Sequence, residues 1–255
     1  MAHVNGRGSS REHDERAHDL EARLTSVRAR ISAAAAAAER PEPELIVVTK
    51  YFPASDVRIL AGLGVRAVGE NRDQEAAAKA AELEDLGLDW HFIGQLQTNK
   101  ARSVVRYARS VHSVDRAPLV VSLGKAVAAE QERRAAAGLA ARADLDCFLQ
   151  FDLDPGAASG GRGGAHPEEA ADLAGAVAGT AGLRLAGVMA VAPLGADPAA
   201  AFGRLLRIAE TVRAVAPSAS AVSAGMSGDL EEAIAAGATH LRIGSDVLGP
   251  RPAVG

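Results

Sequence analysis

Leu45-Ile46-Val47-Val48-Thr49-Lys50 is the stretch that decides the fold of this chain. Its run of four apolar residues predicts a strand that is buried on both faces, as in a parallel sheet. Pro53 follows closely and suits the first turn of a helix. A lysine between such a strand and a helix lies at the edge where parallel α/β folds carry their chemistry. There Lys50 can contact a phosphate, form a Schiff base, or simply extend into water.

The alternation of strand and helix patterns continues along the chain. Strands are expected at Leu45–Lys50, Arg66–Glu70, Trp90–Gly94, Ser110–Val114, Asp146–Leu153, Leu185–Ala192, Ser220–Ala224 and His240–Gly244. Helices are expected at Pro53–Ala61, Asp73–Leu86, Thr98–Ala108, Arg116–Ala143, Pro167–Gly179, Pro198–Val215 and Gly228–Ala236. This pattern predicts an α/β fold, a single (β/α)8 TIM barrel, rather than an open six-stranded sheet.

An extra helix is expected before the first strand. Ser9-Ser10-Arg11-Glu12 has capping-box spacing, and an apolar stripe follows at Leu20, Leu24, Val27 and Ile31. Pro41 and Pro43 end the helix. We expect it to pack on the barrel, with a coiled coil as the alternative. One domain would then span residues 11–255 and include this helix, after a disordered tail at residues 1–10.

Composition argues against several classes of protein. Hydrophobic residues make up 48% of the chain and aromatic residues only 3%, which predicts an aliphatic, alanine-rich core. The net charge of −4 gives no broad basic surface for nucleic acid. Cys147 is the single cysteine, so an internal disulfide framework is excluded. No apolar run reaches membrane-spanning length and the N-terminus is unlike a signal peptide, so we expect a cytoplasmic protein.

Two corners rich in glycine and serine follow the last two expected strands. Ser223–Asp229 leaves strand seven, and Gly244-Ser245 ends strand eight. Barrels of this class commonly bind phosphate at these positions, where small residues admit an anion to backbone amides. Taken singly, the serines are ordinary helix caps. A phosphate pocket opposite Lys50 suits pyridoxal 5′-phosphate, and it equally suits a sugar-phosphate aldolase barrel.

The stretch Ser159–Gly164 looks like a phosphate loop but lacks the Gly-Lys-Ser/Thr ending. We interpret it as a flexible loop between a strand and a helix, with a lid over the barrel mouth as a further hypothesis.

Several motifs, in order along the chain, resemble those of the pyridoxal phosphate homeostasis family, single-domain relatives of the alanine racemase barrel. They are Val47–Lys50, Val68–Asn71, Trp90–Lys100, Ser223–Ser227 and Arg242–Gly244. The resemblance runs from about Leu20 to Arg251, and Trp90–Lys100 is its most distinctive part.

The resemblance implies a role for particular residues. Lys50 would hold pyridoxal phosphate as an internal aldimine, Asn71 would lie near the phenolic oxygen, and Arg242 would face the pyridine nitrogen. The phosphate would be surrounded by Ser223, Gly225, Met226, Gly244 and Ser245. His91 and Asn99 lie in the matched run without an assigned contact, and we interpret His91 as a packed strand residue with a satisfied imidazole.

Three positions depart from the family pattern. Arg72 replaces an aromatic residue that many relatives carry after Glu-Asn, and Ser245 replaces a common threonine while keeping the hydroxyl. The loop 152–166 differs from a segment of the relatives that contains serine and lysine, which weakens the lid hypothesis.

The expected function is to bind pyridoxal phosphate and to buffer or deliver it inside the cell, with no substantial catalysis. The expected partners are the cofactor and apo forms of enzymes that use it, and the expected state is a monomer. Alternatives are an amino-acid racemase, a vitamer sensor that regulates a partner, and a barrel enzyme acting on a phosphorylated sugar.

A racemase would need a second acid/base group beside Lys50. We expect Tyr107 to lie in a helix away from the mouth, the ring of Tyr51 to point outward, and no further domain to supply another tyrosine.

Overall fold

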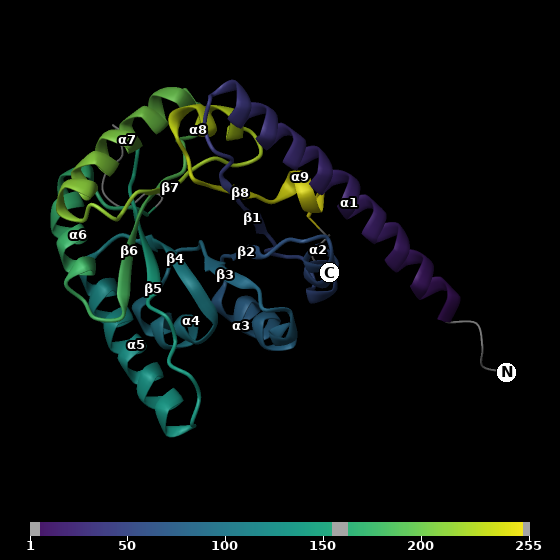
Figure 1. Cartoon of the computed structure of the whole chain (residues 1–255), viewed down its shortest axis with the longest axis horizontal. Helices are drawn as coiled ribbons and strands as arrows, with labels where there is room; N and C mark the ends of the chain where they lie inside the picture. Colours follow the sequence, from purple (N-terminus) through teal and green to yellow (C-terminus); the bar gives the residue numbers. More distant parts are fainter. Residues whose placement is uncertain (1–5, 155–162, 252–255) are drawn as a thin grey trace.

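Eight parallel strands close into a barrel in the computed structural model, which describes residues 6–154 and 163–251. Neighbours along the chain pair with one another, and the first strand pairs with the last. The strands are β1 (Glu44–Val48), β2 (Ala67–Glu70), β3 (Asp89–Phe92), β4 (Ala108–Val114), β5 (Leu145–Gln150), β6 (Leu183–Met189), β7 (Ala221–Ser223) and β8 (His240–Ile243). The predicted barrel is therefore confirmed, and Figure 1 shows its helices arranged around the strands.

The helices follow the strands in the expected order. They are α1 (Gly6–Ala37), α2 (Ala54–Gly62), α3 (Asp73–Glu82), α4 (Ala101–Tyr107), α5 (Ala117–Ala136), α6 (Ala170–Ala178), α7 (Pro198–Val215), α8 (Leu230–Ala236) and α9 (Ser245–Leu248). The described residues also form three short 3-10 helices: η1 (Glu84–Leu86), η2 (Thr98–Lys100) and η3 (Pro167–Glu169). The bounds of α7 are as predicted. α5 ends before the predicted Ala143, because Gly138 takes a left-handed backbone with φ of 66°.

Helix α1 packs against α2, α8 and α9, so the predicted packing on the barrel is confirmed. All four residues of its apolar stripe are buried. One turn before this stripe, Arg16 links α1 to α2 and α9: it donates to the Asp56 carboxylate at 2.6 Å and to the Leu248 carbonyl at 3.0 Å. The helix begins at Gly6, so residues 6–10 of the expected tail are helical, and residues 1–5 lie outside the described part.

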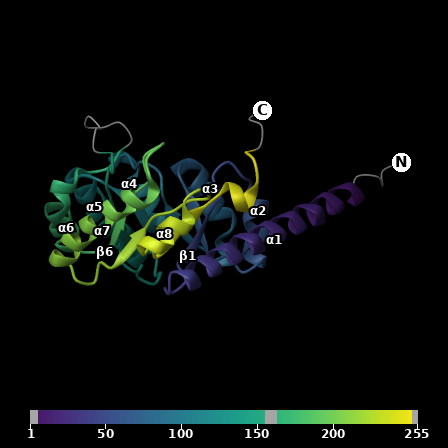
Figure 2. The same cartoon turned by 90° about the horizontal axis from the view of Figure 1, so that it is seen from above.

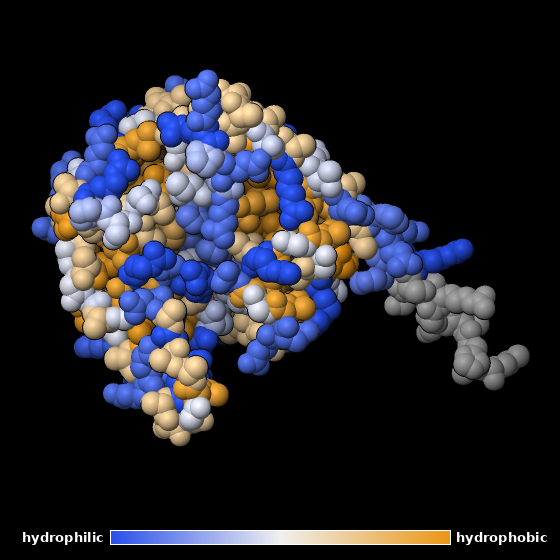
Figure 3. All heavy atoms as spheres, in the orientation of Figure 1, coloured by the Kyte–Doolittle hydropathy of each residue, from blue (hydrophilic) through white to orange (hydrophobic). Residues whose placement is uncertain are grey.

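The N-terminal part of α1 extends beyond the barrel, as Figures 1 and 2 show from two directions. The surface there is strongly hydrophilic in Figure 3, in keeping with the exposed residues 11–15. No helix within residues 6–154 and 163–251 is long and apolar enough to cross a membrane.

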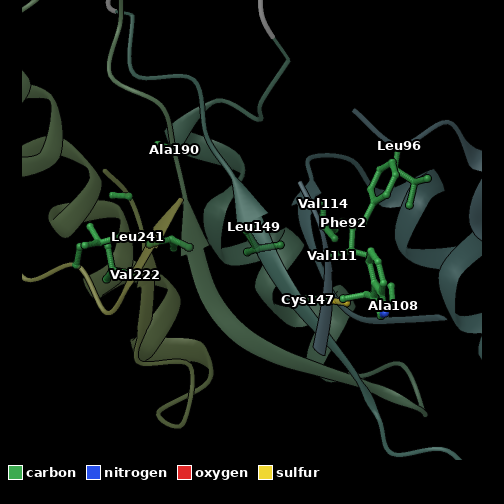
Figure 4. Packing of buried hydrophobic residues seen from close by; sticks show 14 of the residues in the cluster. Phe92, Leu96, Ala108, Val111, Val114, Cys147, Leu149, Ala190, Val222 and Leu241 are labelled. Carbon is green, nitrogen blue, oxygen red and sulfur yellow. The ribbon is translucent and has the colours of Figure 1, made fainter. Parts of the chain in front are cut away.

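The main core lies between the strands and the surrounding helices and is almost wholly aliphatic. Figure 4 shows part of it, with Cys147 among side chains such as Val111 and Ala108. Burial raises the pKa of the Cys147 thiol to about 12, so this cysteine is an inert core residue at neutral pH. A separate small cluster contains Phe148, Ala186 and Met189.

Candidate functional site

A cavity of about 620 Å³ opens at the C-terminal ends of the strands. Of the eight candidate site residues, six line it: Lys50, Asn71, Met226, Arg242, Gly244 and Ser245. Other lining residues were not among the candidates: Val48, Tyr51, Phe52, Ile93, Gly94, Gln95, Gln150, Met189, Val191, Ser227, Gly228, Gly249, Pro250 and Arg251. The described lining residues include three cations, Lys50, Arg242 and Arg251, and no carboxylate. The cavity is therefore suited to an anionic ligand.

Lys50 lies two residues beyond the end of β1, in a turn, and not at the end of a strand as the sequence suggested. The preceding residue fixes this turn. Thr49 is fully buried, and its hydroxyl donates to the Glu70 carboxylate at 2.7 Å. From α3, the ammonium of Lys79 donates to the Thr49 carbonyl at 2.9 Å and to Glu70 at 2.6 Å. A buried ion pair thus holds the backbone from which Lys50 extends into the cavity.

Tyr51 also lines the cavity, so the expectation that its ring points outward is wrong. Its φ of 71° lies in the left-handed region, which is rare for a tyrosine and redirects the side chain. The ring has three cationic neighbours: Lys50 Nζ is 5.9 Å, Arg72 Cζ 5.2 Å and Arg251 Cζ 4.7 Å from its centroid. Such cation–π contacts hold an aromatic ring in place at the edge of the site.

Tyr107 is placed as predicted, in α4 and outside the residues that line the cavity. Its hydroxyl lies 3.4 Å from Asp73, and burial raises its pKa. Asn99 lies in η2 and faces a different hollow, together with Lys100 and Asp73. Neither Tyr107 nor Asn99 therefore contributes to the main cavity.

Asn71 offers an unsatisfied polar atom to the cavity. Its Oδ1 is buried and has no hydrogen-bond partner. The segment after the neighbouring strand β3 approaches closely, since a Cβ placed on Gly94 would lie 2.2 Å from the Asn71 carbonyl oxygen. Because a buried polar atom without a partner is costly, this oxygen indicates that a ligand completes the site.

The expected phosphate corners meet at the cavity. The hydroxyls of Ser227 and Ser245 are 3.2 Å apart and join the segments that follow β7 and β8. The backbone amide of Met226 donates to the Asp229 carboxylate at 2.6 Å, which shapes the first segment. Ser227 lies within the predicted corner Ser223–Asp229 but is not among the predicted phosphate contacts, although the corner itself places it near Ser245.

Two predicted phosphate contacts do not reach the cavity. Ser223 is fully buried, and its hydroxyl accepts from Arg242 at 2.6 Å and lies 2.9 Å from His112 Nδ1. Gly225 is buried as well: a Cβ there would lie 2.6 Å from Ala233 and 2.7 Å from Leu241. Ser223 therefore supports Arg242, and Gly225 allows the chain to pass close to α8 and β8.

Arg242 lies at the floor of the cavity and is only 4% exposed. Besides Ser223, it donates to the Ala190 carbonyl at 2.9 Å. Burial lowers its pKa to about 10, against the opposing effect of Asp229, and the group is still cationic at neutral pH.

A chain of polar side chains continues from Ser223 into the barrel. His112 Nε2 lies 3.0 Å from Ser110 Oγ and 3.1 Å from His91 Nδ1, and Ser110 Oγ lies 2.6 Å from the same His91 nitrogen. The interpretation of His91 as a packed strand residue is correct, but only one ring nitrogen is satisfied, because Nε2 is buried without a partner. Ser110 and His112 were missed, although their period-two spacing in a strand places both on one face.

These histidines make stability depend on pH. Burial lowers the pKa of His91 from 6.5 to about 4 and lowers that of fully buried His112 as well. Between these values and 6.5 the unfolded chain binds more protons than the folded chain, so the free energy of unfolding is highest above pH 6.5 and falls as the pH decreases. His91 alone should remove about 3 kcal/mol between pH 7 and pH 4.

Urea unfolding across this range tests the pH dependence. His91→Gln should flatten the profile, whereas the exposed His18 offers a matched control, and His18→Gln should leave the profile unchanged. Glu44, whose pKa is lowered by its hydrogen bond with His240, adds a further loss only at more acidic pH. A wild-type free energy that stays constant from pH 7 to pH 4.5 would contradict the buried neutral histidines.

The Gly-rich loop lies mostly outside the described residues, and only Gly163 and Gly164 of it can be placed. The Gly163 carbonyl accepts from Gln150 Nε2 at 3.2 Å, and a Cβ on Gly163 would overlap the amide of Gln95. The described end of the loop thus touches two side chains that line the cavity, and its role as a lid stays a prediction.

Comparison with known proteins gives consistent matches over most of the chain. The family model of the alanine racemase N-terminal domain matches residues 22–252. A pyridoxal phosphate homeostasis protein of Mycobacterium tuberculosis is 42% identical over 93% of this chain and 95% of that protein. Its namesake from Escherichia coli K12 is 34% identical over 92% of this chain and 97% of that protein.

Solved structures agree with these matches. PipY of Synechococcus elongatus, solved with PLP bound, matches with a TM-score of 0.74 at 32% identity. The match covers 90% of this chain and 100% of the PipY chain. Alanine racemase of Corynebacterium glutamicum has a TM-score of 0.62 at 14% identity, which shows a shared fold alone. This chain matches 62% of that racemase chain.

Proposed function

The chain belongs to the pyridoxal phosphate homeostasis family, and we propose that it binds pyridoxal 5′-phosphate in the cavity at the barrel mouth, with Lys50 as the covalent anchor. The observation that carries this proposal is a lysine inside a cavity whose described charged lining residues are all cations. All four lysines of the sequence are described, and Lys50 alone among them lines this cavity.

The described residues fit this cofactor. The Lys50 amine can add to the aldehyde with loss of one water, and the Asn71 amide, whose Oδ1 has no partner, can accept or donate at the phenolic oxygen. Gly244, Ser227 and Ser245 form the corner for the phosphate. Arg242, held by two hydrogen bonds, can donate to the ring nitrogen. When bound, the cofactor supplies the reactive aldehyde, and the protein supplies its position and charge balance.

The proposed role is to buffer the cofactor or deliver it to apo forms of the enzymes that use it, in the cytoplasm and as a monomer. Reversible attachment to Lys50 suits both buffering and delivery, because hydrolysis of the linkage releases the intact aldehyde. Mixing the loaded protein with an apo-enzyme, while free cofactor is trapped, tests delivery. Transfer no faster than release into buffer would favour the buffering role alone.

The phosphate corner gives a selective prediction. A Cβ on Gly244 would lie 3.3 Å from the Val48 carbonyl oxygen, so Gly244→Val must displace the corner. Charge-assisted hydrogen bonds to phosphate contribute about 1.5–3 kcal/mol each, so affinity for pyridoxal phosphate should fall by roughly 10- to 100-fold. Affinity for unphosphorylated pyridoxal should change much less. Gly203→Ala, where the added Cβ meets open space, is the control. Equal weakening of both ligands would assign Gly244 to the ring pocket instead.

A racemase is the second candidate, and the position of Tyr51 favours it. Racemisation needs acid/base groups on both faces of the substrate carbanion. Among the described residues that line the cavity, only Lys50 and Tyr51 are candidates, and both come from one turn. Arg242 also favours an unprotonated ring nitrogen, which weakens the cofactor as an electron sink. We therefore propose feeble catalysis at most.

Loaded protein incubated with L-alanine in deuterium oxide tests this proposal, with D-alanine and α-deuterium followed by chiral chromatography and NMR. We expect turnover far below about 1 per second, a modest rate for an enzyme. Turnover at that rate, lost in Tyr51→Phe, would establish the racemase and reject the carrier.

A further inference from the structure

A continuous line of buried side chains runs from the cavity floor into the barrel, and the proposed binding of pyridoxal phosphate does not by itself require it. Its members come from three strands besides β8: Ser223 from β7, His112 and Ser110 from β4, and His91 from β3. Each is at most 5% exposed. Successive polar atoms lie 2.6, 2.9, 3.0 and 2.6 Å apart, starting from the guanidinium of Arg242.

Hydrogen-bond chemistry fixes the first link of this line and favours one direction for the rest. An arginine can only donate, so Ser223 accepts from Arg242 and has its own proton left to give to His112 Nδ1. His112 must then carry its proton on Nε2, which donates to Ser110. Ser110 in turn donates to His91 Nδ1. In this arrangement every donor points away from the cavity. The reverse arrangement, in which His112 Nδ1 donates to Ser223, leaves the Ser223 proton without an acceptor on this line, so we take the first as the favoured one.

Other groups packed around the line are consistent with neutral imidazoles. Phe148 stacks on His112 with ring centroids 4.1 Å apart, and His240 approaches it edge-on at 6.4 Å. The charge of Glu44 opposes the lowering of the His91 pKa, but burial outweighs it, and Glu44 pairs with His240 at 3.1 Å. Arg109 and Arg242 add positive charge near the two imidazoles. A protonated His112 would also present a second donor to Ser223, whose proton would then have no acceptor on this line.

We propose that His112 is a positioning residue: by accepting from Ser223, it fixes that hydroxyl as the acceptor for Arg242 and keeps the guanidinium aimed at the ring nitrogen of the bound cofactor. The part of this inference that concerns the ligand rests on the proposed function, whereas the arrangement of protons among the four side chains does not. It predicts that the ring nitrogen stays an unprotonated acceptor for Arg242, and that this depends on His112 in β4, three strands from the strand β1 that precedes Lys50.

The proton arrangement is tested first in ligand-free protein, so that this result is independent of cofactor binding. Long-range proton–nitrogen NMR on histidine-labelled protein reports which ring nitrogen carries a proton, and His112→Leu assigns the signal. We expect His112 protonated at Nε2 and bare at Nδ1, with His91 bare at Nδ1. A His112 protonated at Nδ1 would overturn the inference, whether or not the protein binds pyridoxal phosphate.

The effect on the ligand is tested with pyridoxal phosphate labelled at the ring nitrogen. Ser223→Ala and His112→Leu should move its nitrogen signal toward the protonated position and weaken binding roughly tenfold, while Ser223→Thr, which keeps the hydroxyl, should restore both. Ser113 is the matched control. It is a fully buried serine next to His112 in β4, and its hydroxyl has no partner. Ser113→Ala should leave the nitrogen signal unchanged.

An unchanged nitrogen signal in both Ser223→Ala and His112→Leu would overturn the positioning role. So would a shift in Ser113→Ala as large as theirs, since that would be a general response to a disturbed core. Failure of wild-type protein to bind the cofactor would reject the proposed function, and the ligand-free NMR result would then judge the inference alone.

Discussion

Lys50→Ala is expected to abolish covalent attachment of pyridoxal phosphate and the yellow colour that accompanies it. The reason is that the other lysines are placed elsewhere. Lys79 is bound to Glu70, Lys100 lies beside Asp73 in a separate hollow, and Lys125 is exposed on α5. None of them can replace Lys50 without a rearrangement of the fold.

Absorbance titration measures this loss, and calorimetry measures the affinity that remains. The phosphate corner and Arg242 are intact in the variant, so weak binding of pyridoxal phosphate should persist. Lys125→Ala is the control and should bind like the wild type. A Lys50→Ala protein that still turns yellow with normal affinity would place the attachment on another lysine.

Lys79→Met is expected to cause the largest loss of stability. The Glu70 side chain is 1% exposed and that of Lys79 11%, and their atoms are 2.6 Å apart. Glu70 Oε2 already lacks a partner, so removing Lys79 leaves a buried carboxylate with the Thr49 hydroxyl as its remaining described partner. Breaking one side of a buried pair costs about 3–5 kcal/mol. The same change frees the Thr49 carbonyl, which should loosen the turn that carries Lys50.

Urea unfolding of Lys79→Met, Glu70→Gln and the double variant measures the coupling between the two groups. The double variant should recover much of the loss, because the uncompensated charge is removed. Lys125→Met, on an exposed part of α5, should change stability by less than about 0.5 kcal/mol. A loss of less than about 1 kcal/mol in Lys79→Met would show that the pair does not hold the turn.

Periodicity predicted the architecture well, because a parallel strand buried on both faces has a clear signature. All eight strands are present, and α7 has its predicted bounds. The largest error in a helix, at the end of α5, arose because a helical pattern was continued through Gly138. α9 was missed because a single turn is too short to show a period.

The site was harder to predict where the direction of a side chain decides its role. The motif after strand seven was assigned to phosphate as one unit, but Ser223 still belongs to β7 and its hydroxyl lies in the barrel. Ser227, four positions later, reaches the cavity. Tyr51 was misplaced because a left-handed backbone at a tyrosine has no signal in a single sequence.

The central claim is that Lys50 holds pyridoxal phosphate in the barrel mouth, and borohydride reduction of the loaded wild-type protein tests it most directly. With only four lysines in the chain, peptide mapping by mass spectrometry can assign the pyridoxyl group without ambiguity. The account predicts one pyridoxyl group per chain, on Lys50. A pyridoxyl group on Lys100 or Lys125, or a tightly bound cofactor that borohydride leaves unattached, would contradict it.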